Sequence, residues 1–327
     1  MTSYNPKPTQ DLLVCTACGT QYPTADRSAL KTCFICDDPR QYTPPSGQSF
    51  TTLAEIRQAG HKNTFTPYPD TNDKNQSEII SITTTPKLAI GQRAILIRTP
   101  VGNILWDCIT LLDSDTFTQI QKLGGLHGIV ISHPHYYSTH IGWAEAFDCP
   151  VYLSAEDAEW IADDPGSSSR SGSGRRVFLT ETETAINING AETGLKAIKL
   201  GGHFPGSLVL LYNQSRRLFI ADTLMSTPSG TANWSVNALG EQRNRPPGVN
   251  SFAFMWSIPN MIPLSAAEIV RMWGILRGYK FGSTHGAFLG SDIEDGNVKR
   301  RVLESMQIQI RSMGYTEHEF LRVTSLE

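Results

Sequence analysis

The sequence predicts an α+β fold in which two packed β-sheets are flanked by helices and preceded by a small cysteine-containing unit. Strand-like runs rich in β-branched and aromatic residues fall into two blocks, and each block is followed by helix-like sequence. Two Cys-x-x-Cys pairs stand apart from both blocks, within residues 11–45. The Pro/Gly segment at 44–47 reads as a linker, so we expect separate units at 1–45 and 46–327.

The first block alternates strand-like and helix-like segments. Its polar stretch at 68–78 is expected to be an exposed loop. Strands separated by Pro and Gly turns are expected at 79–85, 93–99, 102–110, 127–132 and 150–154. Helices, recognised by Thr or Ser/Asp starts and Gly stops, are expected at 51–60, 114–125, around 141–148 and at 154–163.

The second block reads as another sheet with helices after it. Strand-like runs lie at 184–188, 195–200, 207–213, 217–222 and 279–283, and helices are expected at 264–277 and 295–313. A low-complexity loop is expected at 167–176. In the long loop at 226–250, Trp234, Arg243 and Arg245 would either line a pocket or stay solvated.

The composition is that of a folded protein and argues against several classes. The 327 residues are 39% hydrophobic and 18% charged. A net charge of -3, from 28 basic and 31 acidic residues, gives no basic excess for binding nucleic acid. No apolar run reaches the about 20 residues that span a bilayer, and the N-terminus lacks a signal-peptide pattern. We therefore expect a cytoplasmic protein with neither nucleic acid nor a membrane as partner.

Four of the six cysteines form a metal-binding pattern. Cys15 and Cys18, followed by Cys33 and Cys36, make two tight turns that each offer two thiolates. A four-sulfur cage suits zinc, or iron in a rubredoxin-like centre, and the stretch resembles zinc-ribbon and rubredoxin-like knuckles. Zinc is favoured because nothing else in the sequence indicates electron transfer. The segment has few apolar residues, so metal binding should supply its folding energy.

Five further residues stand at or just past the ends of predicted strands. His133 and His135 follow a strand, and at positions i and i+2 of an extended segment their side chains point the same way. His203 lies in a Gly-rich turn, Asp222 ends a strand, and His285 follows another. Loops after strands gather at a sheet edge, where metal sites are often built. One such histidine alone is more often structural, but five residues in this order indicate a metal site.

On these residues, the chain from about 79 to 290 resembles the metallo-β-lactamase-fold hydrolases, which include lactamases, glyoxalase II, lactonases and nucleases. The resemblance implies an αββα sandwich of two mixed β-sheets with the metal site at one edge. It implies a first metal held by His133, His135 and His203, with Asp222 as a further or bridging ligand. It also implies that His285 binds a second metal, and it places the family's structural Asp on Asp107.

The sequence departs from the family motif HxHxDH in its last two positions, which fall on Tyr137 and Ser138. A phenol and a hydroxyl are weak replacements for the carboxylate and imidazole that help to bind the second metal. We therefore expect one tightly bound metal and a second that binds weakly or not at all. Tyr136 and Tyr137 are expected to form the pocket wall or to pack in the interior.

His140 lies two residues beyond the lost histidine position. If a helix begins near Ser138, those two residues rotate the side chain by about 200°, away from the metal. A hydrogen-bonding role is then expected, whereas an irregular backbone through Thr139 would let His140 act as an additional ligand. His61, His127 and His318 have no motif context and are expected to be structural or exposed.

The expected function is zinc-dependent hydrolysis of an ester, lactone, thioester or related bond in a small molecule. Zinc with an open position lowers the pKa of bound water to about 7, and catalysis would depend on His203 and on Asp222, which could orient the water or accept its proton. The alternatives are a rubredoxin-linked diiron oxidoreductase and a non-catalytic metal-binding protein. The diiron members' HxExD pattern is not matched at 133–137. A nuclease is disfavoured by the acidic balance.

Overall fold

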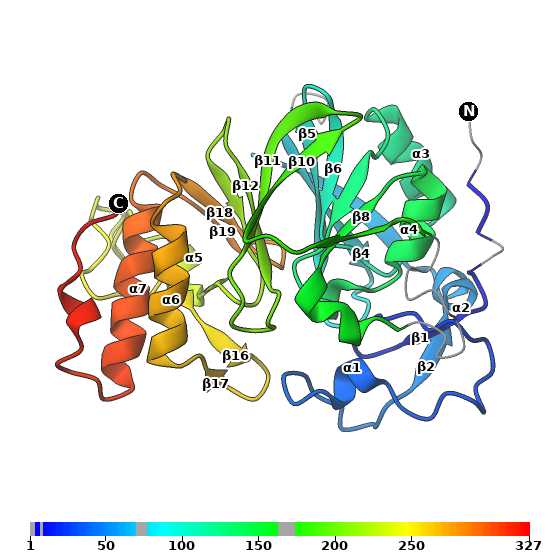
Figure 1. Cartoon of the computed structure of the whole chain (residues 1–327), viewed down its shortest axis with the longest axis horizontal. Coiled ribbons are helices and arrows are strands. Elements are labelled where there is room, and N and C mark those ends of the chain that lie inside the picture. The colour runs from blue at the N-terminus through cyan, green and yellow to red at the C-terminus, as the bar shows by residue number, and fades with distance from the viewer. Residues whose placement is uncertain (1–3, 7–8, 70–76, 163–173) are drawn as a thin grey trace.

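Two β-sheets form the centre of the molecule (Figure 1). The computed structural model describes residues 4–6, 9–69, 77–162 and 174–327. The first sheet has seven strands in chain order, antiparallel from β3 to β6 and parallel from β6 to β9. They are β3 Lys62–Tyr68, β4 Ile79–Thr85, β5 Arg93–Thr99, β6 Gly102–Trp106, β7 Gly128–Val130, β8 Val151–Ser154 and β9 Arg176–Leu179.

The second sheet has six strands in the order β10-β11-β12-β13-β18-β19. Neighbouring strands are antiparallel except β13 and β18, which run parallel. The strands are β10 Glu183–Ile188, β11 Ala191–Lys199, β12 Leu208–Tyr212, β13 Arg217–Phe219, β18 Ser283–His285 and β19 Asp292–Glu294. Two short ribbons accompany them, β14 Met225–Ser226 with β15 Phe252–Ala253 and β16 Met255–Ser257 with β17 Ile262–Pro263.

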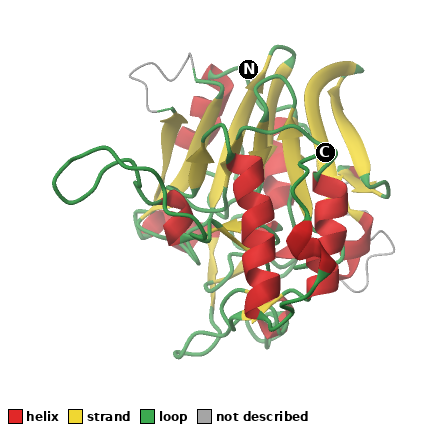
Figure 2. Cartoon of the chain, turned by 90° about the vertical axis from the view of Figure 1, so that its left-hand side faces the viewer, coloured by secondary structure: helices red, strands yellow, loops and turns green. Residues whose placement is uncertain are grey.

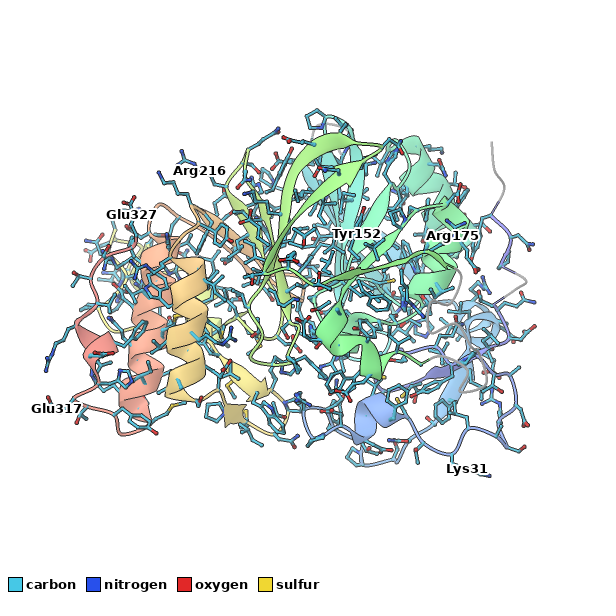
Figure 3. All side chains as sticks on the ribbon, in the orientation of Figure 1. Lys31, Tyr152, Arg175, Arg216, Glu317 and Glu327 are labelled. Carbon is cyan, nitrogen blue, oxygen red and sulfur yellow. The ribbon has the colours of Figure 1, made fainter. Side chains whose placement is uncertain are left out.

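The two sheets pack face to face, and helices cover their outer faces (Figures 1 and 2). Ile97 and Trp106 of the first sheet meet Leu195 and Leu210 of the second in a shared apolar core. Side chains fill the space between the layers (Figure 3), and each fully buried aliphatic chain stabilises the fold by about 1.5–3 kcal/mol. The outer helices are α3 Ser114–Lys122 and α4 His140–Phe147 on the first sheet, and α6 Ala266–Leu276 and α7 Val298–Ser312 on the second. The predicted α+β sandwich is confirmed.

Side-chain caps set where several helices begin. The Asp113 carboxylate accepts the Thr116 backbone N–H at the start of α3, and the Ser265 hydroxyl accepts that of Glu268 at the start of α6. Helix α2 (Leu53–Gln58) begins with a reciprocal capping box between Thr52 and Glu55. Such caps contribute about 1 kcal/mol each, and they explain why the sequence predicted these helix starts.

The cysteine-containing segment forms a small unit of its own, built from β1 (Leu13–Cys15), α1 (Phe34–Asp37) and β2 (Phe50–Thr52). Strand β2 pairs with β1 although it lies beyond the predicted boundary at residue 45. We call residues 11–52 the knuckle unit. Figure 1 draws it in blue, with α1 facing β16 and β17.

Strand direction brings the functional loops to one edge in each sheet. Strands β6, β7 and β8 are parallel, so the segments after their carboxyl ends lie side by side. In the second sheet β11 and β13 are both antiparallel to β12 and therefore run the same way. The residues that follow β7, β11 and β13 are those in which the sequence predicted metal ligands.

A few elements differ from their prediction. The helix expected at 154–163 is a 3₁₀ helix, η2 (Ala155–Trp160). Its Asp157 carboxylate accepts the backbone N–H of Gly206, which lies in the loop between β11 and β12 of the other sheet. The strand expected at 279–283 starts only at Ser283. The loop at 226–250 contains α5 (Pro228–Thr231), and η1 (Pro134–Tyr136) and η4 (Glu319–Arg322) are short 3₁₀ turns.

Much of the loops expected at 68–78 and 167–176 lies outside the described residues. In the described ranges, no helix has the length and apolar character needed to cross a membrane.

Candidate metal centres

The side chains of His133, His135, His203 and Asp222 meet in one buried cluster. Asp222 Oδ2 lies 3.4 Å from His133 Nε2, 3.7 Å from His135 Nδ1 and 3.7 Å from His203 Nε2. The last two nitrogens are 3.2 Å apart. A zinc ion bonded at about 2.0–2.1 Å to four tetrahedral ligands would hold those atoms about 3.3–3.4 Å apart. The four atoms therefore have the spacing of a tetrahedral metal site.

Unpaired polar atoms in the cluster also fit a metal. His133 Nε2 and Asp222 Oδ1 are buried and have no hydrogen-bond partner among the described residues, which is rare for buried polar atoms. Two of the ring nitrogens that face away from the cluster are held, because His133 Nδ1 lies 2.8 Å from Ser132 Oγ and His203 Nδ1 lies 2.8 Å from the Trp256 carbonyl oxygen. Metal-ligating imidazoles are commonly oriented by such outer hydrogen bonds.

Asp107 orients the turn that carries the first two histidines. It follows β6 with a φ of 61°, and its Oδ1 accepts the backbone N–H of Ser132 at 2.7 Å. The Ser132 hydroxyl in turn contacts the His133 ring. Burial raises the pKa of Asp107 to about 7, against the lowering effects of His133 and Ser132. Asp107 thus contacts the metal cluster through Ser132 and is not one of its four members.

Glycine backbone and a shared hydroxyl place His203 beside Asp222. Gly201 and Gly202 have φ values of 65° and 86°, a region that favours glycine. A Cβ atom on Gly202 would lie 2.7 Å from Thr223 Oγ1. That hydroxyl donates to the Gly201 carbonyl and accepts the backbone N–H of His203. The loops after β11 and β13 are therefore locked together at the cluster.

The electrostatics of the cluster favour the metal-binding forms of its side chains. Burial disfavours the charged Asp222 carboxylate, but the adjacent His133, His135 and His203 outweigh it and hold the pKa of Asp222 well below its usual range. Burial lowers the pKa of His135 and of His203. Neutral imidazoles and an ionised carboxylate are the forms that bind a metal.

His285, expected to bind a second metal, lies outside this cluster of four and has polar partners of its own. Its Nδ1 lies 2.9 Å from Asp292 Oδ1, and its Nε2 lies 3.1 Å from both Arg217 Nη1 and Ser283 Oγ. The physical reason is its place in the sheet: His285 is still within β18, paired with Phe219 on one side and Asp292 on the other. It has not yet reached the loops at the strand ends.

His140 and the two tyrosines take the non-ligand alternatives. His140 opens α4, with Nδ1 2.7 Å from the Tyr137 carbonyl oxygen and Nε2 accepting from Arg176 Nε at 2.9 Å. The Tyr136 ring lies 5.4 Å from the His133 ring and so forms part of the cluster's wall. Tyr137 is buried, and its hydroxyl donates to the Asp157 carbonyl at 3.0 Å.

Ser138 binds the knuckle unit. Its backbone carbonyl accepts the N–H of Gln21 at 3.1 Å, and its hydroxyl reaches the Gly19 carbonyl at 3.4 Å and Thr110 Oγ1 at 3.1 Å. Its φ of 44° is unusual for a residue other than glycine. The position at which the resemblance places a second-metal ligand therefore holds a contact between the two units.

The four cysteines meet in a second buried cluster. Cys15 Sγ lies 3.6 Å from Cys36 Sγ, and Cys18 Sγ lies 3.6 Å from Cys33 Sγ. Zinc–sulfur bonds of about 2.3 Å in a tetrahedron imply sulfur separations of about 3.8 Å, so the cage fits zinc. A tetrahedral set of four thiolates also suits iron.

The knuckle unit contacts the histidine cluster through two features that the sequence analysis missed. First, Gln92 Nε2 donates to the Cys18 carbonyl at 3.1 Å and to the His135 carbonyl at 3.4 Å. One amide thus joins a cysteine ligand to a histidine ligand. A single glutamine preceding a strand carries no motif, so nothing in the sequence indicated this role.

Second, the chain that leaves α1 places Asp38 and Arg40 beside the histidine cluster. The Arg40 guanidinium carbon lies 4.6 Å from the centre of the Phe204 ring, next to His203 in sequence. Asp38 accepts from Arg40 and from Trp160 Nε1. These residues follow Cys36 by two and four positions, which was the only available hint that they lie near a metal.

The residues named in the loop at 226–250 do not join either cluster. Arg243 stacks on Trp234, with its guanidinium carbon 5.5 Å from the ring centre. Arg245 donates to Glu304 of α7 at 3.0 Å. Of the two alternatives for this loop, the contacts favour a solvated surface loop.

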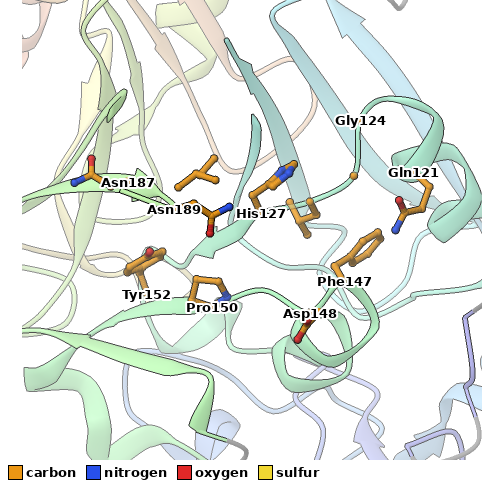
Figure 4. Close-up of a pocket in the computed structure, with 12 residues that line it drawn as sticks. Gln121, Gly124, His127, Phe147, Asp148, Pro150, Tyr152, Asn187 and Asn189 are labelled. Atoms are coloured by element: carbon orange, nitrogen blue, oxygen red, sulfur yellow. The ribbon is translucent and has the colours of Figure 1, made fainter. Parts of the chain in front are cut away.

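Figure 4 shows a cavity of about 380 Å³ that lies apart from both clusters. Its lining includes Gln121, His127, Asp148 and Asn187, and none of the lining residues is a proposed ligand. His127 has a structural contact there, since its Nδ1 accepts the Asn103 N–H at 3.2 Å.

Residues 90–262 match the model of the metallo-beta-lactamase superfamily. A curated relative, "Uncharacterized protein YmaE" of Bacillus subtilis (strain 168), is 34% identical over 304 residues, which cover 92% of this chain and 96% of the relative. Similar solved structures include VMB-1 at pH5.5 (9% identity, TM-score 0.49, 77% of this chain and 98% of that chain). Another is the peroxy diiron species of chemotaxis sensor ODP (16% identity, TM-score 0.46, 77% and 99%).

Proposed function

The chain belongs to the metallo-β-lactamase superfamily, and from that premise we propose that it is a zinc-dependent hydrolase of a small-molecule ester, lactone, thioester or related bond. One observation carries the proposal: three imidazoles and one carboxylate lie buried together at the spacing of a tetrahedral zinc site. Three histidines are a ligand set of catalytic zinc, and a water molecule would reach the ion either in place of Asp222 or as a fifth ligand.

The side chains have separable roles in this proposal. His133, His135 and His203 would hold the ion, which supplies Lewis-acid chemistry and a water molecule activated for attack. Asp222 would place Oδ2 toward the ion, and its unpaired Oδ1 is free to orient or deprotonate that water. Ser132 and the Trp256 carbonyl keep the His133 and His203 rings in the orientation for binding.

The number of ions follows from the two clusters. We propose one zinc in the histidine cluster and one structural zinc in the cysteine cage. A tightly bound second ion beside the histidines would need further ligands, and His285, Tyr137 and Ser138 are engaged in other contacts.

The decisive experiment compares His203→Ala with His285→Asn in the full-length protein. His203→Ala should lose the ion of the histidine cluster, keep that of the cysteine cage and abolish hydrolysis of any ester, lactone or thioester that the unaltered protein cleaves. The loss of affinity should exceed the about 10–100-fold that removal of an outer partner costs. His285→Asn should keep both ions. Elemental analysis gives the ion count, and full activity of His203→Ala would refute the assignment.

A rubredoxin-linked oxidoreductase is the second candidate, and the Gln92 contact favours it. Because one amide bonds to both Cys18 and His135, the two clusters are close enough for an iron cage to exchange electrons with a metal at the histidines. Purification without added metal tests this candidate. Zinc in both clusters would eliminate it, whereas iron in the cysteine cage would support it. Two bound zinc ions with no hydrolysis across the three bond types would favour a non-catalytic protein.

A further inference from the structure

The guanidinium of Arg40 lies in a cage of three aromatic rings. Its central carbon is 4.6 Å from the ring centre of Phe204, 4.9 Å from Trp256 and 5.5 Å from Trp160. Each contact is a cation–π interaction, and together they fix the plane of the guanidinium. Arg40 comes from the knuckle unit, whereas the three rings belong to the larger domain.

One of these rings, and the backbone of a second aromatic residue, also contact the histidine cluster. The Phe204 ring lies 4.9 Å from the His135 ring and 5.1 Å from the His203 ring. The Trp256 carbonyl holds His203 Nδ1 at 2.8 Å. Arg40 and the metal ligands therefore share neighbours, and a small molecule at the metal would have this guanidinium close by.

The hydrogen bonds of Arg40 leave one edge of its guanidinium available. Both bonds that the group makes with described residues leave from Nη1, at 3.0 and 2.9 Å from the two Asp38 oxygens. Nε is buried and has no hydrogen-bond partner in the part of the chain that the structure describes. The free edge, Nε with Nη2, is the one that binds a planar oxyanion side-on with two parallel hydrogen bonds. A buried donor left unpaired is unfavourable, so a ligand oxygen there would satisfy it.

Solvent reaches Arg40 from the side of the His203 loop. A cavity of about 350 Å³ is lined by Arg40, by Gly201 and Gly202, and by Lys199 and Arg271. The Arg40 side chain retains 16% exposure, so it is held in place but remains reachable. Lys199 is paired with Glu156, and Arg271 is paired with Glu268, which also lines the cavity, so recognition of an anion at this opening rests on the free edge of Arg40.

We propose that Arg40 is the residue through which the metal centre recognises an oxyanion of its substrate, a carboxylate or a phosphate. The inference rests on the proposed hydrolase function and narrows its substrate class to anionic molecules. It also gives the knuckle unit a role in the site: the cysteine cage holds the turn from which Arg40 extends.

The test uses the full-length, metal-loaded protein and two substitutions. Arg40→Met keeps a flexible apolar chain among the three rings and removes the charge. Arg40→Lys keeps the charge but cannot offer the paired side-on donors. Arg311→Ala, an exposed arginine on α7, is the control. Succinate and inorganic phosphate are titrated separately, with the fluorescence of the tryptophans as readout. In parallel, hydrolysis of 4-nitrophenyl acetate is compared with that of its anionic analogue, mono-4-nitrophenyl succinate.

The unaltered protein should bind at least one of the two anions. Tighter binding of succinate would identify the recognised group as a carboxylate, and tighter binding of phosphate would identify it as a phosphate. Arg40→Met should weaken that binding about tenfold or more and Arg40→Lys several-fold, with Arg311→Ala unchanged. KM for the anionic ester should rise in parallel while cleavage of the neutral ester is retained.

The proposal is overturned if neither anion binds the unaltered protein, or if Arg40→Met binds both as well as the unaltered protein does. If Arg40→Met loses the cage ion, Arg40→Lys decides, and unchanged affinity in that variant overturns side-on recognition. If neither ester is cleaved while anion binding depends on Arg40, the hydrolase proposal fails and anion recognition stands.

Discussion

Burial keeps the His140 side chain neutral in the folded protein. Its two ring nitrogens face the Tyr137 carbonyl and Arg176, and burial, with the Arg176 charge, lowers the pKa of His140 to about 3. An unfolded histidine titrates near about 6.5. Below that pH the unfolded chain binds a proton that the folded chain does not, so this residue makes stability fall as pH decreases from about 6.5 to about 3.

We predict that His140→Asn removes this contribution. Asparagine can still donate to the Tyr137 carbonyl but does not titrate. Between pH 7 and pH 5.5, the free energy of unfolding should shift in favour of the variant by about 1 kcal/mol relative to the unaltered protein. Urea unfolding at the two pH values measures this shift. His318→Asn, at a partly exposed position, is the control. If the difference in free energy of unfolding between His140→Asn and the unaltered protein does not change with pH, the argument is contradicted.

The residues of the site differ in how well the sequence predicted their positions. His133, His135, His203 and Asp222 follow strands whose ends meet, so their order in the sequence was enough to indicate a cluster. His285 also stands at the end of a strand in the sequence. In the structure it is still paired with Asp292 inside the sheet, and its ring bonds to the Asp292 carboxylate. Strand ends are uncertain by a residue or two from sequence, and that margin decides whether a side chain reaches the edge.

At the scale of elements, the two cysteine knuckles have a very small core. It consists of the four cysteines with Ala17, Tyr22 and Ile35, and α1 is only four residues long. An isolated helix of that length is not stable in water. The metal must therefore supply most of the energy that fixes the chain from Cys33 to Arg40.

We predict that Cys15→Ser combined with Cys18→Ser releases the cage ion and unfolds residues 11–45. Each sulfur faces a sulfur of the other knuckle, so losing one pair leaves two ligands for the ion. Total metal should fall from two ions per chain to about one, measured by elemental analysis. Proteolysis should cut within 11–45. Cys149→Ala, a buried cysteine outside the cage, should keep both ions, and an unaltered metal content in the double variant would rule out the cage.

Elements with strong local patterns were predictable, and those set by distant contacts were not. The runs at 79–85 and 93–99 match β4 and β5 to the residue, because β-branched side chains and flanking turns specify them locally. In η2, by contrast, the Asp157 carboxylate bonds to Gly206 and its backbone carbonyl accepts the Tyr137 hydroxyl. Neither contact is visible from the local sequence.

At the scale of the whole molecule, the knuckle unit is part of the larger domain's structure. Val14 packs with Leu53, Ile56 and Leu111 in one buried cluster. On the other side, Asn260 Nδ2 donates to the Pro39 and Gln41 carbonyls at 3.1 and 3.0 Å. The linker at 44–47 marks a change of composition but not an independent boundary, because β1 and β2 pair across it.

We predict that removal of residues 1–45 destabilises the remaining chain and weakens metal binding at the histidine cluster. Leu53, Ile56 and Leu111 would become exposed, at about 1.5–3 kcal/mol for each fully buried chain. Ser138 and Gln92 would lose the backbone groups of Gln21 and Cys18, and with them the contacts that steady the turn carrying His135. The thermal midpoint should fall, and a chelator should remove the histidine-bound ion faster.

The matched control is the full-length protein cut by a protease site placed at 44–47. Both parts are then present, and the contacts of Val14, Gly19 and Arg40 can persist without the covalent link. If those contacts matter, the cut protein should retain its midpoint and both ions while the truncated protein does not. Loss of stability in both would assign the effect to the chain connection. An unchanged thermal midpoint and full metal occupancy of the histidine cluster in the truncated protein would show that the larger domain folds and binds its metal without the knuckle unit.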